Sequence, residues 1–591
     1  MQILKRVLPI TEWLPRYRAE NLRGDLVAGL TTAVMLIPQA MAYAMLAGLP
    51  PVVGLYASIV PLVLYAMFGT SRQLAVGPVA MVSLLVATGV GQIADTGTEL
   101  FIGYAIVLSM MVGALQLVMG IARLGFLTNF LSHPVLSGFT SAAALIIGFS
   151  QLKHLLGLDI PRSHHVHEIL FAAAGQFGHA HALTVLIGGG SVALLIILKR
   201  MDRRFPAALA VVALSTLVVW FFGLDARGVK IVGEVPPGLP VPRLPSWDPE
   251  AMRALLPTAL TIALVGFMES IAVAKAFAKR KRYDVDANQE LVGLGVANLG
   301  GALFQAYPVT GGFSRTAVNA EAGARTGLAS MITAVVIATT LVLMTPLFHY
   351  LPRAVLAAII MTAVFGLIDV REVRHLWRVK REDLVLLAIT FLATLGVGIE
   401  QGIATGVGVS LLWFVAKATR PHFARLGRLP NTREYRNVGR WPEAEQTDGV
   451  LAVRIDAQLY FGNVSFLKGT LRRLESETGG AIHSVVIDAA SINNLDSSAD
   501  TALHELCEDY GARGISLYLA GTKGPVLDVM RQSGLLQRLG EDRLWLTVAD
   551  AVEAAVSRAA RDGGSRRASE SAGEAPLGQA PMPLRVSPSP T

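Results

Sequence analysis

The stretch from Tyr307 to Arg315 reads YPVTGGFSR and carries residue types suited to binding an anion. It lies between two apolar runs, so we expect it at membrane depth. A charged side chain at that depth is costly unless it is partnered or hydrated, which makes Arg315 a candidate functional residue. The proline, threonine and paired glycines before it predict a helix that breaks and restarts. A helix N-terminus offers free N–H groups and the positive end of a dipole, so this stretch predicts an anion site.

A second broken helix start is expected in the first half of the chain, where residues 74–81 read LAVGPVAM. This segment opens the third predicted span, and residues 308–315 open the tenth. Paired interrupted segments in corresponding positions of two halves indicate the midplane binding site of a transporter. Because the two segments lie seven spans apart, the repeats must be inverted, and the two helix starts can face each other. The alternative is two kinked structural helices, since Gly and Pro are common in membrane spans.

The composition indicates a membrane protein. Of the 591 residues, 53% are hydrophobic and 16% are charged, against about 45–50% and about 25% in soluble domains. The mean hydropathy is +0.51. The net charge of +8 collects in short loops between apolar runs, which suits the cytoplasmic side of a membrane protein and not a nucleic-acid surface. The single cysteine, Cys507, excludes an intramolecular disulfide.

Hydropathy predicts fourteen spans, several of them short or interrupted by Gly and Pro, near 25–48, 52–69, 75–91, 101–120, 126–152, 181–199, 206–223, 254–278, 287–303, 309–322, 327–347, 354–369, 382–398 and 401–419. Alternate loops carry most of the basic residues, so both termini are expected in the cytoplasm. We expect five regions: a cytoplasmic N-terminal segment (1–24), the transmembrane domain (25–419), a linker (420–440), a soluble α/β domain (441–560) and a disordered tail (561–591). In the soluble domain, residues 450–461, 484–489 and 516–521 read as strands, and residues 503–510 and 526–536 as helices.

The motifs IPQAMAYA (37–44), VVGLYASIVPLVLYAMFGTSRQLAVGPVAMVSLL (52–85), FLSHPVLSGFT (130–140) and AYPVTGGFSRTAVN (306–319) resemble those of the SulP anion transporter family, the sulfate permeases. The resemblance runs from Leu22 to about Val556. It implies an α-helical polytopic membrane protein with fourteen spans in two inverted seven-span repeats, divided into a core and a gate domain. It also implies a cytoplasmic α/β STAS domain at the C-terminal end, and a homodimer.

Two polar residues on the first span are candidate ligands. Gln39 and Tyr43 lie one turn apart after Pro38, and an amide and a phenol can both donate hydrogen bonds to an oxyanion. Alternatively, Tyr43 packs as an ordinary aromatic. The planar fork of Arg315 suits a tetrahedral oxyanion such as sulfate. The resemblance places in one substrate pocket Gln39, Tyr43, Val79, Ala80, Phe313, Ser314 and Arg315.

Glu269 lies within the eighth span, the counterpart of the first, and is our candidate for binding a coupling proton. In this hypothesis an entering anion draws Arg315 away from Glu269, so that the carboxylate takes up a proton. The alternatives are a permanent ion pair with Arg315 or a salt bridge with Lys275. Sodium coupling would favour a hydroxyl one turn beyond the acid, where the chain has Val273.

The soluble domain contains IDAASINNLDSSA (487–499), which resembles the STAS signature around a phosphorylatable serine. Ser497 and Ser498 are therefore possible regulatory phosphosites, although Ala499 stands where the signature has glycine. The resemblance favours a role of this domain in folding, assembly and partner contact. His164, His165 and His167 fall in one loop without a completing carboxylate or cysteine pattern, so we expect a solvated loop, no metal site and no cofactor.

The sequence thus predicts a secondary transporter in a bacterial inner membrane that imports sulfate or a similar inorganic oxyanion with protons, by alternating access. Its partners would be the anion, protons, the lipid bilayer and a second copy, with no nucleic acid. Alternatives are a bicarbonate or dicarboxylate transporter, a passive anion channel or exchanger, and a signalling scaffold. An enzyme is not expected, because no catalytic nucleophile–base pair or metal cluster emerges from the spans.

Overall fold

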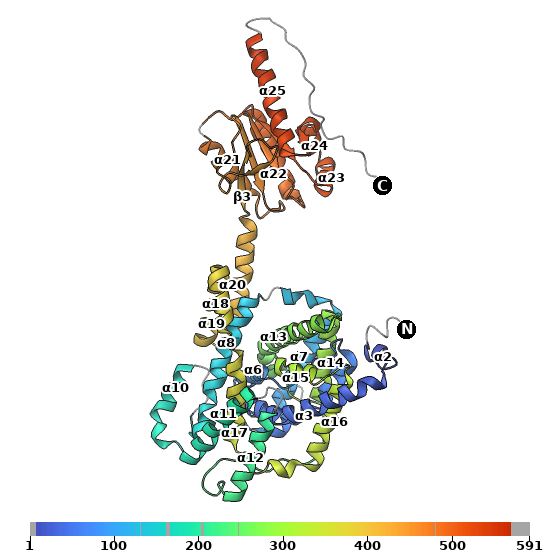
Figure 1. Cartoon of the computed structure of the whole chain (residues 1–591), viewed down its shortest axis with the longest axis vertical. Helices are drawn as coiled ribbons and strands as arrows, with labels where there is room; N and C mark the ends of the chain where they lie inside the picture. Colours follow the sequence, from blue (N-terminus) through green and yellow to red (C-terminus); the bar gives the residue numbers. More distant parts are fainter. Residues whose placement is uncertain are drawn as a thin grey trace. The chain divides into compact units, whose positions relative to one another are not determined.

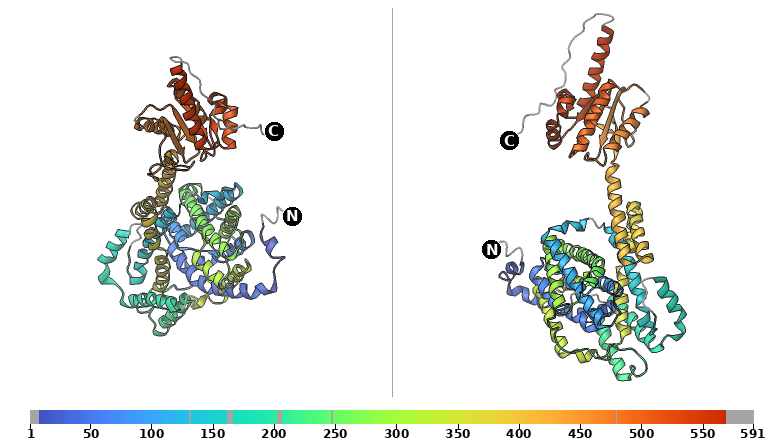
Figure 2. Two further views of the ribbon diagram at one scale, coloured as in Figure 1. Left: turned by 45° about the horizontal axis from the view of Figure 1, so that its top comes forward. Right: turned by 180° about the vertical axis from the view of Figure 1, so that it is seen from behind.

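The structure is a computed structural model, and it describes residues 8–129, 132–160, 166–201, 206–245, 248–478 and 480–568. The chain divides into two compact units, Met1–Ser410 and Leu411–Thr591. The first is a bundle of helices and the second consists mainly of an α/β domain, and both can be followed by colour in Figures 1 and 2.

Each of the fourteen predicted spans coincides with a helix or a helix pair. For the first seven these are α3 (Ala19–Ala47), α4 (Pro51–Tyr56) with α5 (Val60–Phe68), α6 (Ala80–Val90), α7 (Glu99–Ile121), α8 (His133–Ser150), α11 (Ala182–Met201) and α12 (Ala207–Phe222). For the last seven they are α13 (Pro249–Lys281), α14 (Ala287–Leu303), α15 (Phe313–Glu321), α16 (Leu328–Leu343), α17 (Arg353–Val364), α19 (Arg381–Gly396) and α20 (Ile399–Thr419).

Short elements join these helices. They are α2 (Ile10–Trp13), η1 (Leu124–Asn129), α9 (Leu152–Leu156), α10 (Val166–Gly175), η2 (Phe177–His179), η3 (Thr345–Phe348), η4 (Phe365–Leu367) and α18 (Val370–Val379). Among the described residues, eight helical segments are long and apolar enough to cross a membrane. The membrane-type helical fold is confirmed, and the count of fourteen crossings remains a prediction.

The first span begins earlier than predicted, because α3 starts at Ala19 inside the expected N-terminal segment 1–24. Asp25, on its second turn, is fully buried. Its carboxylate accepts hydrogen bonds from the backbone N–H groups of Arg325 and Thr326 at 2.7 and 3.0 Å. These bonds satisfy a buried carboxylate and tie the start of α3 to the turn between α15 and α16.

Two of the predicted spans, the third and the tenth, contain only a short helix each, α6 and α15. Each follows a two-residue strand, β1 (Val76–Gly77) before α6 and β2 (Thr310–Gly311) before α15. An extended backbone at membrane depth must satisfy its polar groups within the protein. The two strands do so by pairing with each other, as described below.

The second unit contains a six-stranded sheet in the order β4-β3-β5-β6-β7-β8. Its strands are β3 (Phe423–Arg428), β4 (Tyr435–Asn437), β5 (Val450–Ile455), β6 (Ser484–Asp488), β7 (Ser516–Ala520) and β8 (Leu544–Trp545). Strands β5 to β8 are parallel, whereas β3 is antiparallel to β4 and β5. The predicted linker 420–440 is therefore partly wrong, because it contains β3 and β4, which add an antiparallel edge to the sheet.

Helices cover both faces of this sheet: α21 (Val464–Glu477), α22 (Ser497–Ala512), α23 (Gly524–Gln532), α24 (Leu535–Leu539) and α25 (Val548–Ala568), with η5 (Glu541–Arg543) before β8. Alternate residues of a strand face opposite sides. Val485 and Ile487 accordingly share a core with α21 to α24, whereas Val486 packs with α25. The predicted tail 561–591 is wrong at its start, since α25 continues to Ala568. Residues 569–591 lie outside the described part of the chain.

Candidate anion-binding site

The two broken helices meet where their extended segments cross. Val76 pairs with Gly311 and Gly77 with Thr310 in an antiparallel ladder, and the N–H of Gly312 donates to the carbonyl of Ala75 at 3.2 Å. Helix α6 begins three residues after this ladder and α15 begins two residues after it. The N-termini of the third and tenth spans therefore come together, as the sequence predicted.

Buried polar side chains hold the second of these segments. The Oδ1 of Asn298 accepts from the N–H of Val309 at 2.8 Å, and its Nδ2 donates to the Val309 carbonyl at 3.1 Å. The Oγ of Ser270 accepts from the N–H of Gly311 at 2.8 Å and lies 2.6 Å from the hydroxyl oxygen of Thr310. Sequence reasoning missed Asn298 and Ser270, although each is a polar residue within an apolar run and could have been singled out on that ground.

Arg315 lies beside the crossing and is 2% exposed. Its Nη1 donates to the carbonyl of Pro78, and its Nη2 lies 3.5 Å from the carbonyl of Thr310. Its Nε has no hydrogen-bond partner within the described chain. The arginine thus touches both broken helices through backbone carbonyls and keeps one buried donor unused.

Glu269, on α13, lies near enough to interact electrostatically with Arg315. Its Oε2 is buried and has no partner among the described residues. Neither of the salt bridges considered from the sequence, to Arg315 or to Lys275, is formed in this part of the structure. The buried Arg315 and the half-buried Glu269 therefore lie near each other without a salt bridge between them in the described part of the chain.

A cavity of about 660 Å³ opens next to the crossing. Gln39 of α3 and Ser314 of α15 lie on one wall, and α11, α12 and α17 form the rest. The cavity extends to Lys199 and Arg200 at the end of α11, a basic end that the distribution of charge places in the cytoplasm. Gln39 and Ser314 therefore share this cavity with the basic end of α11.

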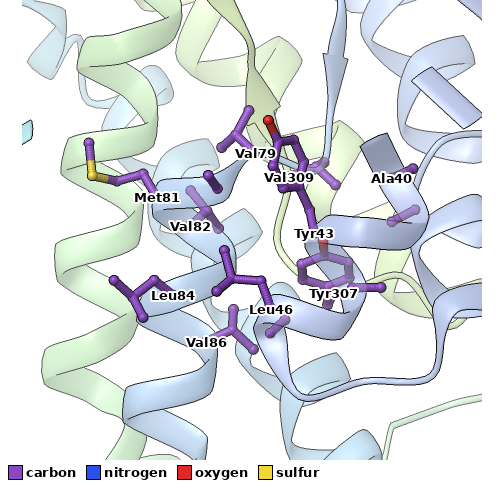
Figure 3. Close-up of a cluster of buried hydrophobic side chains, with 14 of the residues drawn as sticks. Ala40, Tyr43, Leu46, Val79, Met81, Val82, Leu84, Val86, Tyr307 and Val309 are labelled. Carbon is purple, nitrogen blue, oxygen red and sulfur yellow. The ribbon is translucent and has the colours of Figure 1, made fainter. Parts of the chain in front are cut away.

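The other predicted pocket residues lie around this cavity without lining it. Tyr43, 7% exposed, packs with Val79, Tyr307 and Val309 in a buried cluster that Figure 3 shows. Ala80, at the start of α6, is 6% exposed. Phe313 is 57% exposed, and its ring centroid lies 6.1 Å from that of Phe277. The structure therefore brings Gln39 and Ser314 to the cavity, with Arg315 behind them at the crossing.

The candidate phosphosites lie in the first turn of α22, where Ser497 and Ser498 are both exposed. The preceding Asp496 caps this helix by accepting from the N–H of Ala499 at 2.8 Å. Ala499, in place of the expected glycine, is buried and packs in the core. His164 and His165 lie outside the described residues, and no group of metal-binding side chains is found in the part of the chain that the structure describes.

A helical membrane bundle in which two broken helices meet beside a buried arginine has the arrangement of a transporter. The sequence pattern of the Sulfate permease family matches residues 22–390, and that of the STAS domain matches residues 442–551. Over 93% of this chain, 43% of residues are identical to Sulfate transporter 4.1, chloroplastic, of Arabidopsis thaliana, of which 82% is covered. This chain belongs to the sulfate permease family.

Two further similarities agree with this assignment. High affinity sulfate transporter 2 of Stylosanthes hamata is 35% identical, with 93% of this chain and 86% of that relative covered. The structure of the murine Solute Carrier 26 family member A9 anion transporter in the inward-facing state superposes with a TM-score of 0.86 at 26% identity, covering 94% and 95% of the two chains. Anion transport by a multi-pass membrane protein follows from these relationships.

The expected location in a bacterial inner membrane is wrong, since similar proteins are plant sulfate transporters, one of them named chloroplastic. The reason is that the positive-inside pattern reports which face of a membrane a loop lies on. It carries no information about which membrane that is.

Proposed function

We propose that this protein is a secondary active transporter that imports sulfate together with protons by alternating access. The observation that carries the proposal is the crossing of the two broken helices beside Arg315. Sulfate is favoured over bicarbonate and dicarboxylates because the curated relatives are named for sulfate. The guanidinium fork also matches a tetrahedral oxyanion, which can accept two parallel hydrogen bonds.

The binding site in this proposal lies between the crossing and the cavity. The anion accepts from the unused Nε of Arg315, from the amide of Gln39 and from the hydroxyl of Ser314. The N-termini of α6 and α15 add the positive ends of two helix dipoles. Tyr43, Val79 and Ala80 shape the wall behind these ligands, and Phe313 is exposed at the start of α15.

Glu269 binds the coupling proton in this proposal. Its Oε2 is buried and has no hydrogen-bond partner among the described residues, and Arg315 lies near enough to stabilise a negative charge on it. Once an anion occupies the site, it interacts with Arg315 in place of Glu269. Its negative charge also destabilises a negative charge on the Glu269 carboxylate. Protonation of Glu269 then becomes favourable, and proton and anion travel together.

Alternating access requires the site to face each side in turn. In this proposal the described cavity, which reaches the basic end of α11, is the route to the site in the state open to the basic face of the membrane domain. We further propose, from the family resemblance, that the protein works as a homodimer. The same resemblance gives the STAS domain a role in assembly, with Ser497 and Ser498 accessible to phosphorylation.

The test is uptake of labelled sulfate, bicarbonate and a dicarboxylate into proteoliposomes under imposed pH or sodium gradients. We expect sulfate accumulation that follows an inward proton gradient and is indifferent to sodium. Accumulation of bicarbonate or dicarboxylate instead of sulfate would identify that anion as the substrate in place of sulfate. Sulfate flux that equilibrates without following the pH gradient would indicate a passive channel or an exchanger.

A further inference from the structure

A second cavity, of about 410 Å³, lies at the opposite end of α11 from the first. Thr184 of α11 lines it, whereas Lys199 of the same helix lines the central cavity. At about 1.5 Å per residue these two positions are roughly 22 Å apart along the helix axis. Since the Lys199 end is the basic, cytoplasmic one, the second cavity faces the other side of the membrane.

Cationic side chains from three separate segments converge on this cavity. They are Lys153 of α9, Lys230 of the loop after α12 and Arg353 at the start of α17, and Asp159 is the one carboxylate among the described residues that line it. Helices α11 and α17 also begin at its edge, so the positive ends of two helix dipoles lie beside it. The cavity is therefore electropositive by side-chain charge and by backbone orientation.

Lys230 and Arg353 are held as one unit. The Nε of Arg353 donates to the carbonyl of Ile231 at 3.0 Å, and its backbone N–H donates to the carbonyl of Lys230 at 3.0 Å. No hydrogen bond engages the two terminal guanidinium nitrogens of Arg353 within the described residues. The arginine is thus fixed at its inner nitrogen and presents its outer fork for a ligand.

The remaining contacts allow an anion to enter. Lys230 pairs with Asp159 at 2.7 Å, but the two side chains are 54% and 89% exposed, and such exposed pairs are weak. The imidazole of His181 is held on both sides: its Nε2 donates to the carbonyl of Arg227 at 3.1 Å, and its Nδ1 lies 2.7 Å from the hydroxyl oxygen of Thr184. This doubly held ring forms a fixed part of the cavity wall.

We propose that this cavity binds a tetrahedral oxyanion on the face opposite the cytoplasm, with Lys230 and Arg353 as its direct ligands. The same chemistry fits a free sulfate ion and the phosphate of an anionic lipid headgroup. A site there is distinct from the crossing of the broken helices, and its occupancy does not require Arg315.

The proposal is tested by equilibrium binding of labelled sulfate to the full-length protein in lipid-free detergent. We expect two sites in the wild-type protein, one lost in Arg315→Gln and the other weakened at least about tenfold in the double variant Lys230→Gln, Arg353→Gln, because the double variant removes both charged donors of that site. The single variant Lys230→Gln leaves the Arg353 backbone contacts intact and serves as the check on folding. Arg243→Gln, which removes an exposed charge from the same loop outside the cavity, should bind as the wild type does.

A lipid arm separates the two sources of the oxyanion. Thermal unfolding is compared in nanodiscs of phosphatidylglycerol and of phosphatidylcholine. Stabilisation by phosphatidylglycerol that the double variant loses, without a second sulfate site in detergent, would identify a lipid phosphate as the occupant. If the double variant matches the wild type both in sulfate stoichiometry and in its response to phosphatidylglycerol, the proposal is overturned.

Discussion

Gly77 and Thr310 lie opposite each other in an antiparallel ladder, although they belong to different halves of the chain. The ladder allows two helices to stop within the bilayer, because each extended segment satisfies the backbone of the other. It also fixes the position of Arg315, which bonds to the carbonyl of Pro78 next to Gly77 and approaches the carbonyl of Thr310. The guanidinium of Arg315 and the N-termini of α6 and α15 therefore form one structural unit.

Replacing Arg315 by lysine should abolish sulfate uptake while leaving membrane insertion intact. A lysine keeps the positive charge but has no fork with which to reach Pro78 and Thr310 and still donate to an anion. The measurement is initial uptake in proteoliposomes, with monodispersity by size exclusion as the control for folding. Uptake within twofold of the wild type would show that Arg315 is not a ligand of the transported anion.

Replacing Glu269 by glutamine should separate transport from the proton gradient. An amide cannot take up the coupling proton, so sulfate would still exchange across the membrane but would no longer accumulate when the outside is acidified. Glu321→Gln, at the exposed end of α15, is the matched control and should keep the pH response. Continued proton-driven accumulation in Glu269→Gln would assign the proton to another group.

Replacing Gly312 by alanine should weaken sulfate binding. A Cβ at this position would lie 2.9 Å from Nη2 and 3.0 Å from Cζ of Arg315, so the guanidinium would have to move from its place beside the two broken helices. We expect the KM for sulfate to rise about tenfold, as for a lost charged hydrogen bond. Gly103→Ala, where a Cβ meets nothing within 4 Å, should leave the KM unchanged.

Replacing Ser270 by alanine should destabilise the crossing. The change leaves the buried N–H of Gly311 without its acceptor, which costs about 1–3 kcal/mol. The expected result is a lower midpoint of thermal unfolding together with weaker sulfate binding. Ser58→Ala removes a buried hydroxyl that bonds to the Gly54 carbonyl one turn earlier in the chain. This substitution should lower the midpoint of unfolding and the affinity for sulfate less than Ser270→Ala does. Equal effects of the two substitutions would argue against a positioning role for Ser270.

Replacing Asp456 by asparagine should reduce the stability of the STAS domain only above acidic pH. Arg454 donates to this carboxylate at 2.6 and 3.1 Å, and the Nδ1 of His422 lies 2.9 Å away. The hydrogen bond from Arg454, followed by that from His422, lowers the pKa of Asp456. The stabilisation is therefore complete above the unfolded value of about 3.9, and it disappears as the pH falls through the lower folded pKa.

Thermal unfolding of the full-length protein between pH 3 and pH 8 measures this effect. The variant should lose about 0.5–1 kcal/mol at neutral pH and converge with the wild type in acid. Asp528→Asn, which breaks an exposed pair with Arg531, should change little at any pH. A deficit of Asp456→Asn that grows as the pH falls would contradict the assigned direction of the pKa shift.

The sequence was sufficient to predict the broken helices, because glycine, proline and a charged residue within apolar runs are local signals. The family resemblance grouped Gln39 and Ser314 in one pocket, and the structure has both on the wall of one cavity. The sequence could not show that Glu269 and Arg315 form no salt bridge. The same two residues at the same positions are compatible with an ion pair and with separated side chains. Strands β3 and β4 were missed because residues 420–440 are rich in charged residues, and their pairing with β5 is a long-range contact.

The sequence by itself determined that this chain spans a membrane, that it belongs with anion transporters and that an arginine lies where lipid would not tolerate an unsupported charge. These conclusions depend on hydropathy, helix-breaking residues and charge, which are properties of short segments. Only the tertiary structure decided that Val76 and Gly77 meet Thr310 and Gly311, that Asn298 and Ser270 hold the second segment, and that Lys230 and Arg353 share a second cavity. Each of these contacts joins segments that are far apart in the chain. Such segments come together only when the whole helical domain packs.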